Sequence, residues 1–346
     1  MSDARRGPDP RPPLEETVLY ITTQGTQLGV NDNQYEIRDL SDTGEGEPSP
    51  NILEKFPVEK IETVNIFGRG VDLTSAVIAM ASRTQTAINY FTTNGRFRGR
   101  FVPGETSVAL LHEQQHHLSE SDTHDVALRI VAGKVTNARR YLGRKGVEVP
   151  EDDGLATALT RLQAAETLNE IRGIEGAAAK SFFRHYEDTL ADGWTMDGRS
   201  RRPPEDHVNS LLSLTYTMLE REAEAALRQV NLDPFVGIFH DMRHGRPALA
   251  LDLMEEFRRG FADPFVARLI NTETLTHDDF TVENELRDGA FDTYLSQFDQ
   301  YLAEELTHDI VDRTLTRRET IRVQANLLRK RIIGDIPEYP PYETSR

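Results

Sequence analysis

The segment HEQQH has the residue types and spacing of a zinc peptidase site, with His112, Glu113 and His116 as its members. Two histidines one helical turn apart can bind Zn²⁺, and the glutamate between them acts as general base in such enzymes. A third protein ligand is also required. The extended form of the motif fails, because Ser119 and Asp122 stand where Gly and His are needed. The segment therefore predicts either a peptidase site or a solvated, His-rich helix face.

A second group of residues predicts a different chemistry. Glu175 lies among small residues in the first turn of a predicted helix, and His240 ends an apolar stretch. Asp252 and Glu255 lie three apart, on one face of a later helix. Carboxylates and an imidazole from three helices would suit Mg²⁺ or Mn²⁺ and phosphoryl transfer. The alternatives are a helix-dipole role for Glu175, a solvated face for the later acids, and a zinc pair of His240 with His244.

Composition narrows the classes of partner. The chain has no cysteine, so disulfides, thiolate metal sites and cysteine nucleophiles are excluded. It has no apolar run long enough for a membrane span and no secretory signal, so we expect a cytoplasmic protein with no membrane partner. The formal net charge of −17 argues against nucleic acid. A salty cytoplasm or ordinary solubility would each explain that charge, so any DNA contact must rely on local arginine clusters.

The elements that must position these residues change in kind along the chain. Residues 1–14 have the composition of a disordered arm. Residues 15–103 show the alternation of short antiparallel strands, with turns at Asn31-Asp32-Asn33 and Asn94-Gly95 and one short helix opened by Asp72 or Thr74. Runs of strands followed by runs of helices predict an α+β fold, in which a strand-rich, β-sandwich-like N-terminal domain precedes an all-α catalytic domain.

Residues 104–335 make up the predicted helical domain. Their 3.6-residue periodicity predicts helices over 107–118, 122–143, 154–171, 174–191, 207–230, 247–270 and 291–333. Residues 336–346 form a Pro-rich tail, which we expect to be loose.

Four separated motifs in the helical domain resemble those of the CRISPR-associated adaptation integrases, the Cas-one family. They are IEGAAAKSFF (174–183), RRPPEDHVNSLLSLTYTML (201–219), LDPFVGIFH (232–240) and RPALALDLMEEFR (246–258). The order, spacing and identity of the motifs agree with the family across nearly the whole domain, and the strand-rich first domain fits it as well.

The resemblance implies a role for each residue of the second group. It implies that Glu175, His240 and Glu255 are catalytic and bind Mg²⁺ or Mn²⁺, with Asp252 as a supporting carboxylate or a ligand of a second metal. It also implies a metal-dependent endonuclease that cuts DNA in antiviral defence. With a Cas-two partner, the enzyme would integrate short double-stranded DNA fragments into a repeat array by 3′-hydroxyl attack on a phosphodiester.

We expect the first domain to form a homodimer with its counterpart. The candidates for DNA contact are two arginine clusters, Arg96, Arg98 and Arg100 in the first domain and Arg199, Arg201 and Arg202 in the second. Each arginine could equally decorate a solvated turn. A DNA-binding scaffold that has lost catalysis remains an alternative function.

Overall fold

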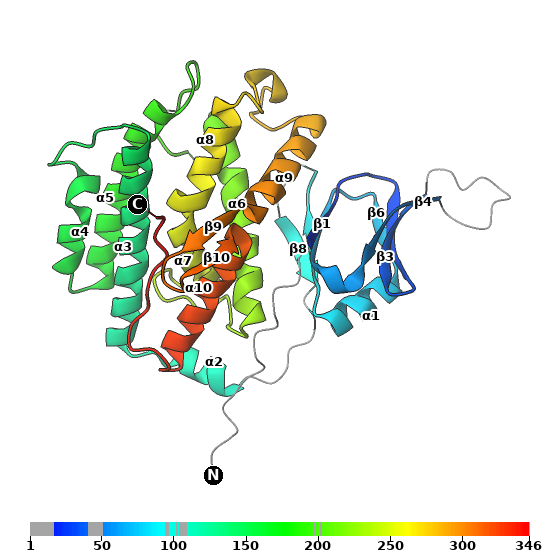
Figure 1. The fold of residues 1–346 in the computed structure, drawn as a ribbon, viewed down its shortest axis with the longest axis horizontal. Helices are drawn as coiled ribbons and strands as arrows, with labels where there is room; N and C mark the ends of the chain where they lie inside the picture. Colours follow the sequence, from blue (N-terminus) through cyan, green and yellow to red (C-terminus); the bar gives the residue numbers. More distant parts are fainter. Residues whose placement is uncertain are drawn as a thin grey trace, which may run out of the picture. The chain divides into compact units, whose positions relative to one another are not determined.

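The computed structural model describes residues 17–40, 51–93, 97–101, 103, 109–196, 198–200 and 203–345. The chain divides into two compact units between Gly104 and Glu105 (Figure 1). The first unit is rich in strands and the second in helices, so the predicted α+β class is confirmed. No helix in the described ranges is long and apolar enough to cross a membrane.

Two four-stranded sheets build the first unit. One has the order β1-β5-β7-β8 and consists of Thr17–Ile21, Ile61–Phe67, Ala87–Phe91 and Phe97–Phe101. The other has the order β4-β3-β2-β6 and consists of Asn51–Pro57, Gln34–Asp39, Thr26–Asn31 and Val71–Leu73. Buried side chains of both sheets and of helix α1 (Ser75–Thr84) share one hydrophobic core.

The strand directions differ in part from the prediction. The hairpin of β2 and β3 is antiparallel, as predicted, and its turn residues Asp32 and Asn33 have φ of 45° and 63°. Strands β1, β5 and β7 instead pair in parallel. Alternation shows which face of a strand is buried but not its direction, and a crossover that includes α1 joins β5 to β7. Strands β7 and β8 are antiparallel, and the predicted turn at Asn94-Gly95 lies outside the described residues.

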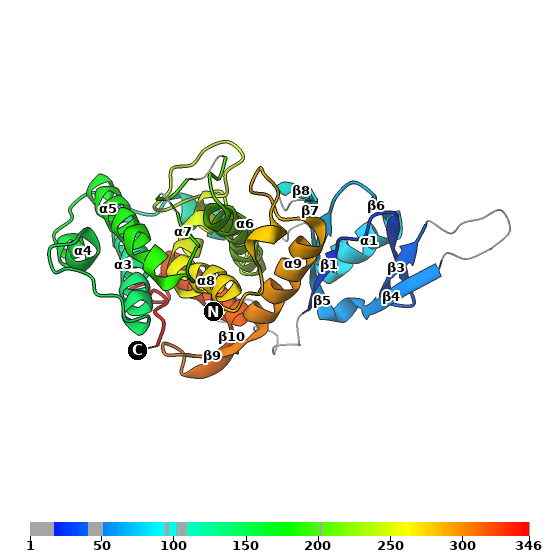
Figure 2. The ribbon, with the colours of Figure 1, turned by 90° about the horizontal axis from the view of Figure 1, so that it is seen from above.

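The second unit is helical (Figure 2). Its helices are α2 (Ala109–His116), α3 (Glu120–Arg144), α4 (Gly154–Gln163), α5 (Leu168–Tyr186), α6 (His207–Gln229), α7 (Ala248–Phe257), α8 (Asp263–Asn271), α9 (Asp288–Ala303) and α10 (Arg317–Ile332). Helix α7 packs against α3, α6 and α10, and all ten of its residues are buried. A π-helical turn, Arg258–Ala262, joins α7 to α8.

Three predicted helices are wrong in extent. The predicted helix over 154–171 is too long, because α4 ends at Gln163. The predicted helix over 291–333 is broken by the hairpin of β9 (Glu305–His308) and β10 (Arg313–Thr316). A capping box of Thr316 and Glu319 starts α10 after it, a local signal that the apolar periodicity hides. Helix α5 likewise begins at Leu168 rather than at 174, because Thr167 and Glu170 form a capping box there.

The prediction that the C-terminal tail is loose is also wrong. Tyr339 is fully buried, and its hydroxyl donates to Glu256 Oε1 over 2.5 Å. The backbone N–H of Tyr342 donates to Glu256 Oε2 over 2.6 Å, while its ring stacks on Phe257. Asn137 of α3 holds the same tail through the carbonyl of Tyr342 and the N–H of Thr344. A Pro-rich composition indicates an extended chain, but it does not show whether that chain packs against the folded domain.

Candidate metal centre

Helix α7 buries three carboxylates, those of Asp252, Glu255 and Glu256. Buried acids are unfavourable unless they are paired or hydrogen-bonded, so their partners identify their roles. Glu256 receives hydrogen bonds from the C-terminal tail and from Gln324 of α10. The other two acids face the elements that contain His240 and Glu175.

Asp252 fixes the loop that ends in His240. Its Oδ2 accepts the backbone N–H groups of Ile238 (2.6 Å) and Phe239 (3.0 Å), and its Oδ1 accepts the N–H of His240 (2.8 Å). The same Oδ1 lies 2.7 Å from Nδ1 of the His240 ring. The Nδ1–H of the ring donates to this carboxylate, which leaves Nε2 as the ring nitrogen that could bind a metal ion. That Nε2 lies 3.9 Å from Glu255 Oε1.

Glu255 lies between three groups that can carry positive charge. Its side chain is 3% exposed, with Oε2 2.6 Å from Lys134 Nζ and Oε1 3.2 Å from Arg258 Nη2. Burial alone would raise the pKa of this carboxyl. The charges of Arg258, Lys134 and His240 outweigh burial and hold the pKa of Glu255 well below its usual range. The site therefore keeps a carboxylate ionised in a position that is almost closed to water.

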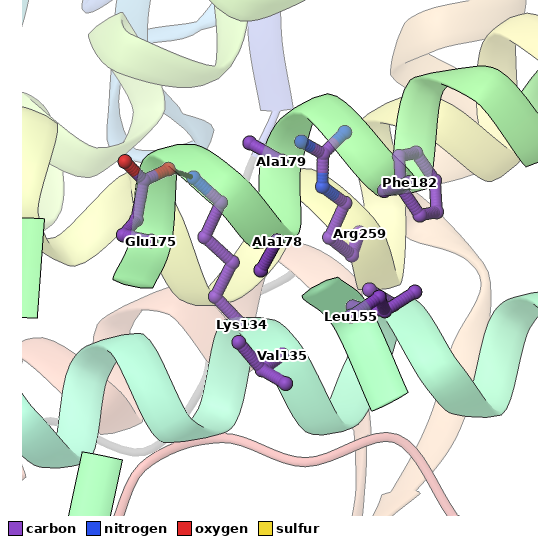
Figure 3. A pocket seen from close by; sticks show the side chains of 9 residues that line it. Lys134, Val135, Leu155, Glu175, Ala178, Ala179, Phe182 and Arg259 are labelled. Carbon is purple, nitrogen blue, oxygen red and sulfur yellow. Dashed lines mark hydrogen bonds and ion pairs between the residues drawn. The ribbon is translucent and has the colours of Figure 1, made fainter. Parts of the chain in front are cut away.

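Glu175 reaches the same place from α5. Its Oε1 also pairs with Lys134 Nζ, and its side chain is 22% exposed (Figure 3). The prediction that Glu175 lies in a first helical turn is wrong, because α5 begins seven residues earlier, at Leu168. Its carboxylate therefore does not interact with the helix dipole at the N-terminus of α5. It faces the site, so the structure brings Glu175 and Glu255 together around the ammonium group of Lys134, with His240 beside Glu255.

A narrow crevice continues from Lys134 and Glu175 into the helix packing (Figure 3). Its remaining lining is apolar except for Arg259, and consists of Val135, Ala138, Leu155, Ala178, Ala179, Phe182 and Arg259. Arg259 is buried in the π-helical turn, pairs with Asp263 over 2.5 Å and lies 4.0 Å from the centre of the Phe182 ring. The opening of the crevice is charged, and its interior offers no polar ligand apart from this paired arginine.

The predicted ligands fit a divalent cation in their chemistry. Two carboxylates and one imidazole nitrogen are donors that Mg²⁺ and Mn²⁺ accept. The Lys134 ammonium, itself a cation, stands between the two carboxylates. Glu255 Oε2 is buried, and its partner is the Lys134 ammonium at 2.6 Å. As the described side chains stand, no three His, Asp or Glu residues are grouped to hold a metal ion. The arrangement therefore suits a metal ion that replaces the ammonium.

Sequence reasoning missed Lys134, although one signal was present. Lys134 is one of six lysines in the chain, and it interrupts the apolar face formed by Ile130, Val131, Val135 and Ala138 on α3. A charged side chain at such a position needs a buried partner of opposite charge. The pattern therefore indicates an ion pair, although it does not identify the partner.

The HEQQH segment plays a different part from the one its spacing predicts. Helix α2 ends at His116, whose side chain is exposed, as is that of Glu113. His112 Nε2 lies 3.1 Å from the carbonyl oxygen of Asn231, so this nitrogen is already engaged. No third ligand approaches within the described residues. The structure does not assemble a zinc site here.

The buried member of the segment is Gln115, which holds the loop before His240. Its amide donates to the carbonyls of Asp233 (2.7 Å) and Val236 (3.2 Å) and accepts the N–H of Asp233 (2.9 Å). Gly237 follows, where an added Cβ would lie 2.5 Å from the carbonyl oxygen of His240. Gln115 from one side and Asp252 from the other therefore fix the approach of His240.

The arginine candidates are only partly described. Arg98 is exposed on β8, Arg100 lies on the same strand with partners, and Arg96 lies outside the described residues, as do Arg201 and Arg202. Arg199 donates to Asn209 Oδ1 (2.8 Å) and Ser213 Oγ (3.0 Å), and it lies over the Tyr216 ring. These contacts bind Arg199 to α6, and they give it a structural role.

The sequence was compared with known families. A family model described as "CRISPR associated protein Cas1" matches residues 19–300. The chain belongs to the Cas1 family. The "CRISPR-associated endonuclease Cas1 4" of Methanospirillum hungatei is 39% identical over 100% of this chain and 96% of its own length. The "CRISPR-associated endonuclease Cas1 3" of Thermus thermophilus is 35% identical over 84% of this chain and 88% of its own.

Solved structures share the fold. A casposase bound to an integration product has a TM-score of 0.80 at 22% identity, covering 95% of each chain. A Cas6-RT-Cas1–Cas2 complex contains a chain with a TM-score of 0.75 at 20% identity, matching 96% of this Cas1 chain and 36% of that longer chain. At such identities the likeness concerns the fold alone.

Proposed function

We propose that this Cas1 chain is a divalent-metal-dependent DNA endonuclease and integrase of CRISPR adaptation. The observation that carries the proposal is the convergence of Glu175, Glu255 and His240 Nε2 from three separate elements. Mg²⁺ or Mn²⁺ is the proposed cofactor, because the donors are oxygen and imidazole nitrogen without thiolate. The names of the curated relatives, which are endonucleases, support the same activity.

Each residue of the site would have a distinct role. A bound divalent ion would polarise the scissile phosphodiester and offset the charge that develops on its oxygens. Glu175 and Glu255 would supply its oxygen ligands, and His240 would supply Nε2. Asp252 would hold the imidazole so that Nε2 remains the acceptor, as supporting carboxylates do for metal-bound histidines. The attacking group would be the 3′-hydroxyl of the incoming DNA fragment, so no side chain would become covalently attached.

Asp252 fits this supporting role better than that of a ligand for a second metal. Its two carboxylate oxygens already receive four hydrogen bonds, from three backbone N–H groups and from the imidazole of His240. Binding a metal ion would break several of them and release the loop.

The proposed partners are DNA, a Cas2-type protein and a second copy of the chain. A casposase with this fold is bound to an integration product, and a complex with a chain of this fold contains Cas2. With a net charge of −17, the chain must approach DNA through local positive charge. Arg98 is an exposed candidate in the described part of the first unit.

The test is strand transfer of a fragment with free 3′-hydroxyl ends into a labelled repeat array, with a Cas2-type partner and with Mn²⁺, Mg²⁺ or a chelator. Glu175→Gln and Glu255→Gln should each lower the rate by more than about a hundredfold, the scale seen when a group that stabilises transition-state charge is removed. Both variants should still bind DNA. The matched control is Glu113→Gln, an exposed glutamate in the second unit, which should transfer strands like the unaltered chain.

The other outcomes decide between the alternatives. DNA binding by the unaltered chain without any strand transfer would indicate a scaffold without catalysis. Loss of activity in His116→Ala with activity kept in Glu255→Ala would point to the peptidase segment. Either result would overturn the proposal.

A further inference from the structure

Lys134 occupies the point at which the two proposed carboxylate ligands meet. Its ammonium pairs with Oε1 of Glu175 and lies 2.6 Å from Oε2 of Glu255 (Figure 3). Its side chain is only 5% exposed, and it extends from the middle of α3, which is anchored along its length. The ammonium is therefore part of the folded site and not a surface charge that swings in solvent.

Positive groups face both proposed carboxylate ligands without a metal ion. Lys134 and Arg258 contribute two positive charges, and the carboxylates of Glu175 and Glu255 contribute two negative ones. Removing one member of a buried ion pair leaves the other uncompensated, which is strongly unfavourable. Lys134 thus stabilises two carboxylates that would otherwise repel each other in a nearly dry place.

A divalent ion would compete directly with this ammonium. Both need the same oxygens, since Oε1 of Glu175 and Oε2 of Glu255 already face Nζ. Two cations cannot share these oxygens without strong repulsion at such short range. Lysine, unlike arginine, has a compact head on a flexible four-carbon stem, so it can leave the position by rotation. The apolar crevice beside it offers no new partner, and the partly exposed side of Glu175 is the available way out.

We propose that Lys134 is a built-in cation that holds Glu175 and Glu255 together in the metal-free protein, and that a divalent ion must displace it to bind. Lys134 is then a positioning residue that lowers the apparent metal affinity. Without the metal, the two acids stay assembled around one cation. The inference rests on the proposed function, because it takes these carboxylates as the metal ligands.

Direct metal binding tests the inference without any activity assay. Mn²⁺ is titrated into the metal-free, full-length chain and into Lys134→Met, with calorimetry and the electron paramagnetic resonance of free Mn²⁺ as readouts. Methionine matches the unbranched four-atom stem of lysine and removes the charged nitrogen. We expect Lys134→Met to bind Mn²⁺ more tightly by roughly fivefold to a hundredfold, the range of typical coupling between two ligands. Lys145→Met, an exposed lysine at the end of the same helix, should leave the affinity unchanged.

Thermal unfolding supplies a second readout. Metal-free Lys134→Met should unfold at a lower temperature than the unaltered chain. Saturating Mn²⁺ should raise the unfolding temperature of the variant by more than it raises that of the unaltered chain. Should metal-free Lys134→Met fail to fold, Lys134→Gln, which can still donate hydrogen bonds to both acids, takes its place in the same titration.

Three results are distinguishable. Tighter Mn²⁺ binding in the lysine variant supports displacement. Equal or weaker binding, with only a loss of stability, overturns the inference and leaves Lys134 as a structural ion pair. Equal binding by the unaltered chain and Glu255→Gln would place the metal elsewhere, and then the proposed function itself fails, whatever Lys134 does.

Discussion

Replacement of Asp252 should lower the stability of the second unit and the availability of His240 together. The carboxylate accepts four hydrogen bonds in a fully buried position. Asp252→Ala leaves three backbone N–H groups and one imidazole N–H without their acceptor. A buried donor left unpaired costs about 1–3 kcal/mol, and water entering the space left by the side chain should recover part of the sum. We therefore expect a loss of about 3–6 kcal/mol in the free energy of unfolding.

Asp252→Asn should lower the stability less than Asp252→Ala does. Its amide oxygen can still serve His240, whereas its NH₂ group would face the N–H groups of Ile238 and Phe239, which lose their acceptor. About half of the loss, roughly 2–3 kcal/mol, should follow. Both variants should also bind Mn²⁺ more weakly, because a released imidazole no longer presents Nε2 beside Glu255.

The assay uses the one tryptophan of the chain. Trp194 is buried in the second unit and stacked on His277, so its fluorescence during urea unfolding reports on that unit. Asp292→Asn, at an exposed position on α9, is the control and should unfold like the unaltered chain. If Asp252→Ala unfolded within about 0.5 kcal/mol of the unaltered chain, the scale of ordinary surface substitutions, the account of the loop would be wrong.

Three further changes probe the supports of the site. Gln115→Leu removes the three hydrogen bonds to the loop before His240 and should lower stability by about 2–3 kcal/mol in urea unfolding, while the exposed Gln114→Leu should not. Deletion of 336–346 should lower the midpoint of thermal unfolding sharply, because it removes two buried tyrosines at about 1.5–3 kcal/mol each; an unchanged midpoint would contradict the docked tail. Burial lowers the pKa of His308, so below about pH 6.5 the unfolded chain takes up a proton that the folded chain resists. Stability should therefore fall as the pH drops through that range, and His308→Gln should make urea unfolding less dependent on pH between about 7.5 and 5.5.

The sequence alone was informative where local pattern decides structure. Alternation and periodicity separate the strand-rich unit from the helical one, and the turn at Asp32 and Asn33 follows from residues that tolerate positive φ. The grouping of Glu175, His240 and Glu255, which lie up to 80 residues apart in the sequence, came from motifs that resemble a family, and the structure brings these side chains to one place. Spacing alone suggested a metal site but left a dipole role and a solvated face open.

What the sequence did not reveal depends on contacts between distant segments. Lys134 lies 41 residues from Glu175, and the tail reaches Glu256 across more than 80 residues. Helical periodicity shows that Lys134 is on a buried face, but not which acid meets it there. The parallel pairing of β1 with β5 and β7 is equally invisible to alternation. The HEQQH segment misled for the converse reason, since its local spacing is right while its surroundings provide no third ligand.

The three buried acids of α7 show how one helix couples stability to chemistry. Successive residues on an α-helix point about 100° apart, so Glu255 and Glu256 face different neighbours although they are adjacent in sequence. Glu256 binds the tail that also holds Asn137 of α3, three residues beyond Lys134. Asp252 binds the loop that presents His240. The position of Glu255 is thus set from both sides, so that Glu255 and His240 are held by contacts outside the site, whereas Glu175 is held by Lys134. Loosening the tail should therefore weaken metal binding without touching a ligand, whereas a site held only by its own ion pairs would not respond.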